Sequence, residues 1–372
     1  MPPLRVAVVG TGAFGRNHLR VYRELEAAQP QLVQLVALVD PITERRSSFA
    51  STYNIPAFAS VAELLAANLS LDAASICVPT SHHAAIAEQL LLAGLDILIE
   101  KPFAATLAQA DHILALSKAQ GRVVAIGHLE RFNPAVTATV AALTKPMFFE
   151  SHRLSIFTPR SLDVDVVLDL MIHDLDIVLS LTNSPVREVR AVGLPILSHK
   201  TDIANVRVEF ESGCVANFTA SRVSTEQVRK LRLFQPRQYL SLDFARQELL
   251  TISVDPAVVA AAIAAAVTAP VRATTAAGSS PLPAPTAVAT ASRPTSDPSP
   301  SAHGEHPTAG LSLTRADIPK GEPLRLELED FLNAVRTRTQ PRVPAQAGRE
   351  ALALALSIID QIAAHAHRAG LL

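Results

Sequence analysis

The sequence has few of the features on which secreted and metal-stabilised proteins depend. It has no tryptophan and only two cysteines, Cys77 and Cys214, among 372 residues. Two thiols cannot form a disulfide framework and are typical of a reducing compartment, so we expect a cytoplasmic protein. No Cys/His cluster has the spacing of zinc ligands, and we therefore expect no metal.

Charge and hydropathy argue against two further classes. Lys and Arg total 33 against 34 Asp and Glu, which leaves no excess of cations to neutralise nucleic-acid phosphates. The longest plain apolar run, residues 257–267, has 11 residues and is mostly alanine, whereas roughly 20 are needed to cross a bilayer. No signal-peptide cleavage pattern precedes the first glycine motif. We expect neither a nucleic-acid partner nor membrane insertion.

The first third of the chain alternates short β-rich runs with amphipathic stretches. Strand–helix alternation at this pitch is typical of βαβ units, which form a parallel sheet with helices on both faces. We predict a doubly wound α/β domain over residues 1–127. The expected strands are 5–10, 32–40, 73–79, 96–100 and 123–127, and the expected helices are 15–28, 61–68, 82–93 and 106–119.

After residue 128 the pattern changes to longer strands. In Asn205–Glu211 the even positions are apolar and the odd ones polar, which indicates an antiparallel sheet with one covered face. We predict an α+β domain over 128–372 with an open, mostly antiparallel sheet. The expected strands are 147–157, 186–194, 203–211, 214–222 and 230–244, and the expected helices are 165–182 and 347–367.

Residues 256–309 form a compositionally distinct tract. Its 54 positions hold 17 Ala and 9 Pro and no aromatic residue. Such a segment cannot bury enough surface to offset its ordering entropy, so we predict a disordered insertion. We expect order to resume near Pro323.

A glycine motif follows the first predicted strand and opens a helix, as in dinucleotide-binding folds. The glycines permit a tight turn and close approach of a pyrophosphate to the helix N-terminus. Asp40 ends the second strand, where a carboxylate binds ribose hydroxyls and repels a 2′-phosphate. We therefore predict NAD rather than NADP, although Arg45 and Arg46 lie close enough to accept a phosphate. The predicted contacts are Gly10, Gly12, Ala13, Phe14, Gly15, Asp40 and Arg45.

Polar residues follow three later strands of the same domain. The carboxyl ends of strands line the ligand crevice of a doubly wound sheet. We predict further cofactor contacts there, with helix capping by Thr80 and a surface Glu–Lys pair as alternatives. These residues are Pro79, Thr80, His83, Glu100, Lys101 and Arg131.

Asp169 and His173 lie four residues apart on a predicted helix. At that spacing the two side chains share one face, and a carboxylate can orient an imidazole for general-base work. The alternative is a solvated helix face. Both residues are candidate catalytic groups.

Taken together, these motifs resemble the Gfo/Idh/MocA oxidoreductase family. They occur in one order: the glycine motif running into Arg16-Asn17-His18, then P-T-S-H-H, E-K-P, G-H-L-E-R-F-N-P and D-L-M-I-H-D-L-D. The resemblance spans residues 4–250 and 322–360. It implies a Rossmann domain followed by an α/β domain whose open sheet supports substrate binding and contacts in a homodimer or homotetramer.

The resemblance also implies residue roles. Lys101 would contact the nicotinamide ribose and the substrate, and Pro102 would follow a cis peptide bond. His173 would accept a hydroxyl proton while hydride passes to NAD, with Asp169 fixing the imidazole and Lys101 stabilising the developing charge. Lys101, Asp169 and His173 are thus both catalytic and substrate-binding candidates.

Within the family, the motifs are most similar to members that oxidise C3 of UDP-N-acetylglucosamine in lipid A precursor synthesis. Arg153 and Arg160 would then clamp the diphosphate bidentately, with surface arginines as the alternative. Two features depart from the family pattern, namely Asp165 at a position where glycine is common and the 256–309 insertion. A dehydrogenase of a free polyol such as inositol remains an alternative, as does a cofactor-bound sensor or scaffold without turnover.

Overall fold

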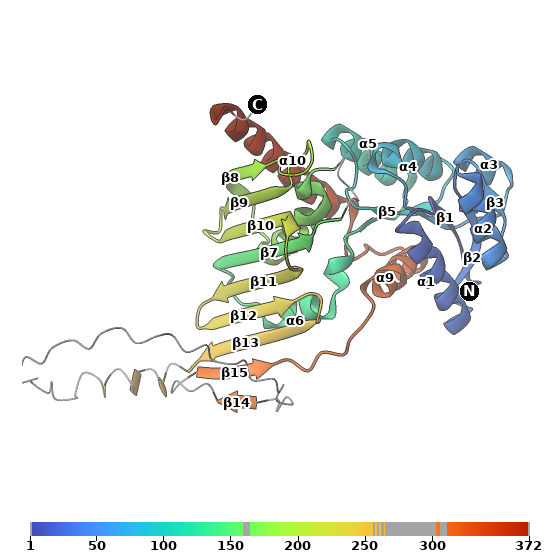
Figure 1. Ribbon diagram of the computed structural model, residues 1–372. Coiled ribbons are helices and arrows are strands. Elements are labelled where there is room, and N and C mark those ends of the chain that lie inside the picture. The colour runs from blue at the N-terminus through green and yellow to red at the C-terminus, as the bar shows by residue number, and fades with distance from the viewer. Residues whose placement is uncertain are drawn as a thin grey trace, which may run out of the picture.

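The computed structural model describes residues 2–158, 164–255 and 311–370, together with parts of 257–264 and 303–305. Two sheets lie side by side, and the helices α1, α9 and α10 run near their junction (Figure 1). The predicted insertion falls almost entirely outside the described residues. Among the helices that are described, none has the length and hydropathy of a transmembrane span.

The first sheet is parallel and has six strands in the order β3-β2-β1-β4-β5-β6. This order reverses direction after β1, as in a doubly wound fold, and confirms the predicted fold class. The strands are β1 Leu4–Val9, β2 Val33–Val39, β3 Ala57–Phe58, β4 Ala73–Ile76, β5 Asp96–Glu100 and β6 Val124–Gly127. The helices of this part are α1 Gly15–Ala28, α2 Thr43–Tyr53, α3 Val61–Ala66, α4 His83–Leu92 and α5 Leu107–Gln120, with a short 3₁₀ turn η1 at Thr80–His82.

The second sheet has nine strands in the order β14-β15-β13-β12-β11-β7-β10-β9-β8. Its neighbours pair antiparallel except β10 and β7, which run parallel. The strands are β7 Phe148–Ile156, β8 Val186–Leu194, β9 Ile203–Phe210, β10 Val215–Ser224, β11 Val228–Gln235, β12 Gln238–Asp243, β13 Glu248–Val254, β14 His303–Glu305 and β15 Leu311–Arg315.

Two predictions about this part of the chain differ from the structure. The single strand expected over 230–244 is a hairpin, in which Gln235 pairs with Gln238 across a two-residue turn. Pro236 has no N–H to offer the ladder, and Arg237 has a φ of 65°, so the chain reverses here. Order also resumes before Pro323, because β15 pairs with β13 over Leu311–Arg315.

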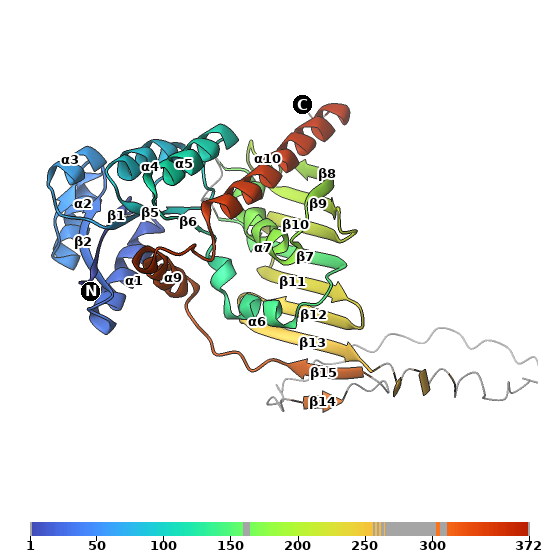
Figure 2. The same ribbon diagram turned by 180° about the vertical axis from the view of Figure 1, so that it is seen from behind.

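Helices cover one face of the second sheet and join it to the first (Figure 2). The covering helices are α6 Pro134–Ala142, the π-helical turn η3 Val167–Met171, α7 Ile172–Thr182 and α10 Ala345–Arg368, whereas η2 Leu129–Phe132 and α9 Pro323–Thr337 belong to the connection with the first sheet. Helix α9 buries Leu328, Phe331 and Leu332 in one apolar cluster with Tyr22 and Leu98 of the first sheet's layer. The chain therefore passes to the second sheet after β6 and returns to cover the first.

Candidate active site

The glycine turn between β1 and α1 is shaped for a phosphate. A Cβ on Gly15 would lie 1.8 Å from the carbonyl oxygen of Gly10, and Gly10 itself has a φ of +89°. Both positions thus require glycine for the turn itself. A Cβ on Gly12 would meet only Arg45 Nη1, at 3.8 Å, so its space is open to a ligand. The turn fits a dinucleotide pyrophosphate at the start of α1.

A cavity of about 960 Å³ lies over this turn at the carboxyl ends of β1, β2 and β4. It brings together residues that are far apart in the chain. Six predicted cofactor contacts line it: Gly10, Gly12, Ala13, Asp40, Arg45 and Pro79. Their contact with a cofactor stays a prediction, and their convergence on one cavity supports it.

Asp40 is only 2% exposed and is held by hydrogen bonds. It accepts from the Thr11 N–H at 2.9 Å, from the Thr11 hydroxyl at 2.6 Å and from the Ile42 N–H at 2.8 Å. Burial opposes ionisation, but these hydrogen bonds and the charge of Arg45 outweigh it and lower the pKa of Asp40. A fixed carboxylate therefore lines the cavity at the end of β2.

Among the predicted cofactor contacts that do not line this cavity are His83, Thr80 and Phe14. His83 is 1% exposed, and its ring nitrogens lie 3.0 Å from the Pro102 carbonyl oxygen and 2.9 Å from that of Val78. It ties the loop after β5 to the end of β4, and its contact with a cofactor stays a prediction. Thr80 starts η1, and the Phe14 ring packs on His18 with centroids 5.5 Å apart.

The end of β5 carries the predicted catalytic lysine. The Lys101–Pro102 bond is cis, which confirms that expectation. Lys101 Nζ donates to the main-chain carbonyl oxygen of Asp169 at 2.7 Å and lies 3.6 Å from Asp169 Oδ1. Burial lowers the pKa of Lys101, while the charges of Asp169 and Glu100 oppose that shift. An ammonium of lowered pKa is suited to stabilising negative charge on oxygen.

Glu100, the residue before Lys101, is buried rather than exposed. It is 7% exposed and pairs with His18 Nε2 at 2.9 Å. Its carboxylate is held by His18, and its contact with a cofactor stays a prediction. His18, part of the family motif, is fully buried and had no assigned role.

His173 lies at the start of α7, and its ring is partly exposed. Its Nδ1 is buried and has no hydrogen-bond partner among the described residues, which leaves Nε2 as the atom available to a substrate. Burial, followed by the charges of Lys101, Arg153, His128 and Arg229, lowers the pKa of His173 well below its usual value. The imidazole is therefore neutral near pH 7 and able to accept a proton.

The predicted orientation of His173 by the Asp169 carboxylate is wrong. Within the described chain, no hydrogen bond joins the two side chains, and Asp169 instead pairs with Lys101. Asp169 lies in the π-helical turn η3, which ends directly before α7, so the helix that carries the two residues is not regular. The His173 ring instead meets His128 edge-on, with centroids 6.4 Å apart.

His128 directly follows β6, beside the end of β5 that carries Lys101. It is 1% exposed, and neither ring nitrogen has a partner among the described residues. His128 belongs to the G-H-L-E-R-F-N-P motif, but its distance from His173 in the sequence gave no indication that the two rings meet. Its position at a strand end was the one available signal.

Arg153 is buried and paired with protein carboxylates, whereas a diphosphate clamp would need free donors. It is 4% exposed and forms a bidentate pair with Asp174 at 2.8 and 2.9 Å, and its Nη1 lies 3.1 Å from Glu130. Its donors are engaged by protein carboxylates, so it holds α7 against η2 instead of clamping a diphosphate. Arg160 falls outside the described residues.

Two further predicted residues have clear local roles. Arg131 contacts the carbonyl oxygen of Asp176 at 3.4 Å and that of Arg342 at 3.3 Å, and its contact with a cofactor stays a prediction. Asp165, at the position where glycine is common in the family, accepts a hydrogen bond from the Val167 N–H at 2.9 Å. Its side chain thereby fixes the backbone at the first residue of η3.

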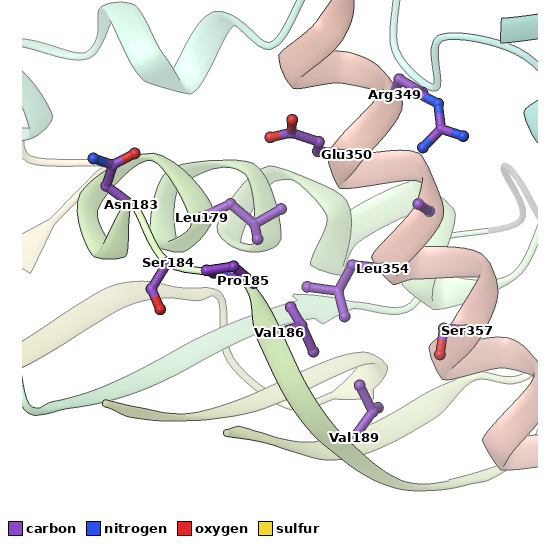
Figure 3. Close-up of a pocket in the computed structure, with 11 residues that line it drawn as sticks. Leu179, Asn183, Ser184, Pro185, Val186, Val189, Arg349, Glu350, Leu354 and Ser357 are labelled. Carbon is purple, nitrogen blue, oxygen red and sulfur yellow. The ribbon is translucent and has the colours of Figure 1, made fainter. Parts of the chain in front are cut away.

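A second cavity, of about 530 Å³, lies between α7, β8 and α10 (Figure 3). No predicted site residue lines it. Its two charged residues are Arg349 and Glu350, and Arg349 pairs with Asp111 on α5. Its lining is otherwise aliphatic or small and polar, without a base or nucleophile of the kind found around His173.

A Rossmann sheet with an open glycine turn, and a lysine beside a neutral histidine, define an NAD-binding oxidoreductase. Residues 4–128 match the model described as "Oxidoreductase family, NAD-binding Rossmann fold", and residues 136–236 match the GFO/IDH/MocA C-terminal domain. The chain belongs to the Gfo/Idh/MocA oxidoreductase family.

Among its relatives is the UDP-N-acetylglucosamine 3-dehydrogenase of Acidithiobacillus ferrooxidans, 33% identical over 95% of this chain and 96% of the relative. A solved structure of that enzyme covers 98% of this chain and 99% of its own, with a TM-score of 0.79 and 34% identity. The scyllo-inositol 2-dehydrogenase of Bacillus subtilis is 25% identical over 59% of this chain and 68% of its own. Myo-inositol 2-dehydrogenase from Lactobacillus plantarum shares the fold at 14% identity, with a TM-score of 0.70 over 98% of each chain.

Proposed function

We propose that this protein oxidises the C3 hydroxyl of UDP-N-acetylglucosamine to a ketone with NAD as the hydride acceptor. The chemical part of the proposal depends on one observation, the approach of Lys101 from the first sheet to the helix that carries His173. The substrate part is supported by similarity to the Acidithiobacillus enzyme along nearly the whole of both chains.

In the proposed mechanism, His173 Nε2 accepts the proton of the substrate hydroxyl, since Nδ1 is buried. Lys101 stabilises the negative charge that develops on the oxygen as the proton leaves. Asp169 holds the Lys101 ammonium through its carbonyl oxygen and carboxylate. When bound, NAD supplies the hydride acceptor, and the open space over Gly12 is suited to its pyrophosphate.

We propose NAD rather than NADP because Asp40 is ionised and fixed at the end of β2. A 2′-phosphate there would meet a buried negative charge. Arg45 lines the same cavity, and its positive charge would instead attract a 2′-phosphate. Initial rates with NAD and with NADP at matched concentrations test the choice, and a preference for NADP would reverse it.

The substrate proposal is tested by NADH formation with purified protein. We expect absorbance at the NADH wavelength to rise with UDP-N-acetylglucosamine and not with myo-inositol. Turnover of myo-inositol alone would favour the free-polyol alternative. If neither compound gave hydride transfer in a single-turnover reaction, the result would favour a non-catalytic sensor.

We also propose that the protein works in the cytoplasm as a homodimer or homotetramer. Both cysteines are free, as a reducing compartment requires. Helices cover one face of the nine-stranded sheet, which leaves the other available to a second copy (Figure 2). Light scattering of the purified protein would give the mass, and a monomer at micromolar concentration would contradict the oligomer.

A further inference from the structure

Two arginines lie opposite each other on neighbouring strands of the second sheet. Arg229 of β11 pairs in register with Arg153 of β7. Residues directly opposite on antiparallel strands project to the same face. Farther along β11, Leu231 and Leu233 alternate with exposed positions and are fully buried on that face. Arg229 therefore lies on the helix-covered face, at the end of β11 beyond the apolar core.

The two arginines differ in what they can bind. Arg153 is buried, and Asp174 and Glu130 occupy its donors. Arg229 is exposed, and its guanidinium makes no hydrogen bond or ion pair with the residues that the structure describes. Its five N–H donors are thus available to an anion.

Arg229 also lies close to the proposed base. Its cross-strand partner Arg153 is bonded to Asp174, the residue that follows His173 on α7. The charge of Arg229 is among those that lower the pKa of His173. An anion bound by Arg229 would therefore lie near His173, on the side of the second sheet.

We propose that Arg229 binds the diphosphate of the nucleotide-sugar substrate and so places the sugar over His173. The inference rests on the proposed function and replaces Arg153 in the role first expected for it. Guanidinium groups bind phosphate oxygens bidentately, and such charge-assisted bonds are the strong ones. A neutral polyol offers this side chain no charged partner, so Arg229 makes the site selective for phosphorylated sugars.

The test compares Arg229→Gln with the control Lys230→Gln, whose side chain belongs to the opposite face of β11. Lys230 lies 4.0 Å from Asp243 and takes no part in the site. Titration calorimetry measures the binding of UDP and of uridine to the NAD-loaded protein. We expect Arg229→Gln to weaken UDP binding by roughly 10- to 100-fold, as the loss of charge-assisted hydrogen bonds predicts. Uridine binding should not change, and Lys230→Gln should bind both like the wild type.

Steady-state kinetics provide a second measurement. Arg229→Gln should raise the KM for UDP-N-acetylglucosamine while kcat stays within a few-fold, and Arg229→Lys should restore part of the loss. Unchanged UDP affinity in Arg229→Gln, or wild-type protein that does not bind UDP, overturns the inference. Wild-type protein that binds UDP through Arg229 but does not oxidise the nucleotide sugar overturns the proposed function alone.

Discussion

Lys101 Nζ donates a 2.7 Å hydrogen bond to the carbonyl oxygen of Asp169. The bond joins the end of β5 in the first sheet to the π-helical turn η3 in the second part of the chain. Asp169 lies in the turn that leads into α7, so this contact links the lysine of the first sheet to the segment that precedes the proposed base. The geometry of the site thus depends on how the two sheets meet.

Gly12→Ala tests the phosphate turn. Because a Cβ at Gly12 would meet only Arg45 Nη1, at 3.8 Å, the variant should fold normally. The added methyl would occupy the space over the turn and weaken NAD binding by roughly tenfold or more, about 1.4 kcal/mol. Fluorescence titration with NAD measures the affinity, and thermal unfolding provides the control. Wild-type NAD affinity in a folded variant would show that the pyrophosphate binds elsewhere.

Arg153→Met tests the revised role of that residue. The substitution leaves Asp174 and Glu130 buried without their cation, which typically destabilises a protein by about 3–5 kcal/mol. Arg232→Met is the matched control. Arg232 of β11 pairs with Glu150 of β7, the strand that carries Arg153, but the Arg232 side chain is 36% exposed. Its loss should cost no more than about 1 kcal/mol. Urea unfolding measures both, and equal effects would contradict the buried network.

The pH dependence of kcat/KM reports the protonation of His173. The neutral imidazole is the base, so activity is lost as pH falls through its folded pKa. Burial and neighbouring cations lower that pKa well below 6.5, and the acid limb should lie below pH 6.5. Rate profiles from about pH 4.5 to 8 locate the limb. A limb at or above pH 6.5 would mean that the imidazole is not held neutral.

Much of the first sheet could be predicted from the sequence, because its strands are continuous apolar runs separated by helices with one apolar face. Helix α2 was missed because it buries no residue, so its sequence has no apolar stripe. Strand β3 has only two residues, too few for a pattern. The glycine turn and Asp40 could be placed because both lie next to strands that are easy to recognise.

The catalytic helix could be predicted only in part. Spacing in sequence assumes 3.6 residues per turn, and the π-helical turn over Val167–Met171 breaks that assumption between Asp169 and His173. The environment of Arg153 could not be predicted for a different reason. The neighbouring sequence does not distinguish buried Arg153 from exposed Arg229. Arg153 is buried because carboxylates on η2 and α7 pair with it, and Arg229 is exposed because that end of β11 extends beyond the core.

Glu327 on α9 gives a prediction about stability. It is 2% exposed, and neither carboxylate oxygen has a hydrogen-bond partner among the described residues. Burial, with the charges of Glu100, Asp330 and Asp176, raises the pKa of Glu327 well above 4.5. The folded protein therefore keeps a proton that the unfolded chain loses, and this group lowers stability as pH rises from 4.5 through the folded pKa.

Glu327→Gln removes that dependence. We expect its free energy of unfolding to fall less steeply than that of the wild type between about pH 5 and 8. Glu329→Gln, on the same helix but partly exposed beside Arg325, is the control and should follow the wild type. Urea unfolding across the pH range measures the difference. Parallel profiles for the wild type and Glu327→Gln would show that Glu327 is ionised in the folded protein.

The most direct test of the central claim is single-turnover hydride transfer by Lys101→Ala and His173→Ala in the NAD-loaded protein with UDP-N-acetylglucosamine. A positioned acid–base group contributes on the order of 10²–10⁴-fold, so each variant should transfer hydride slower by that factor. The dissociation constant for NAD should stay within a few-fold of the wild type. Near-wild-type transfer in either variant would contradict the account, because the lysine and the histidine would then not act on the reacting hydroxyl.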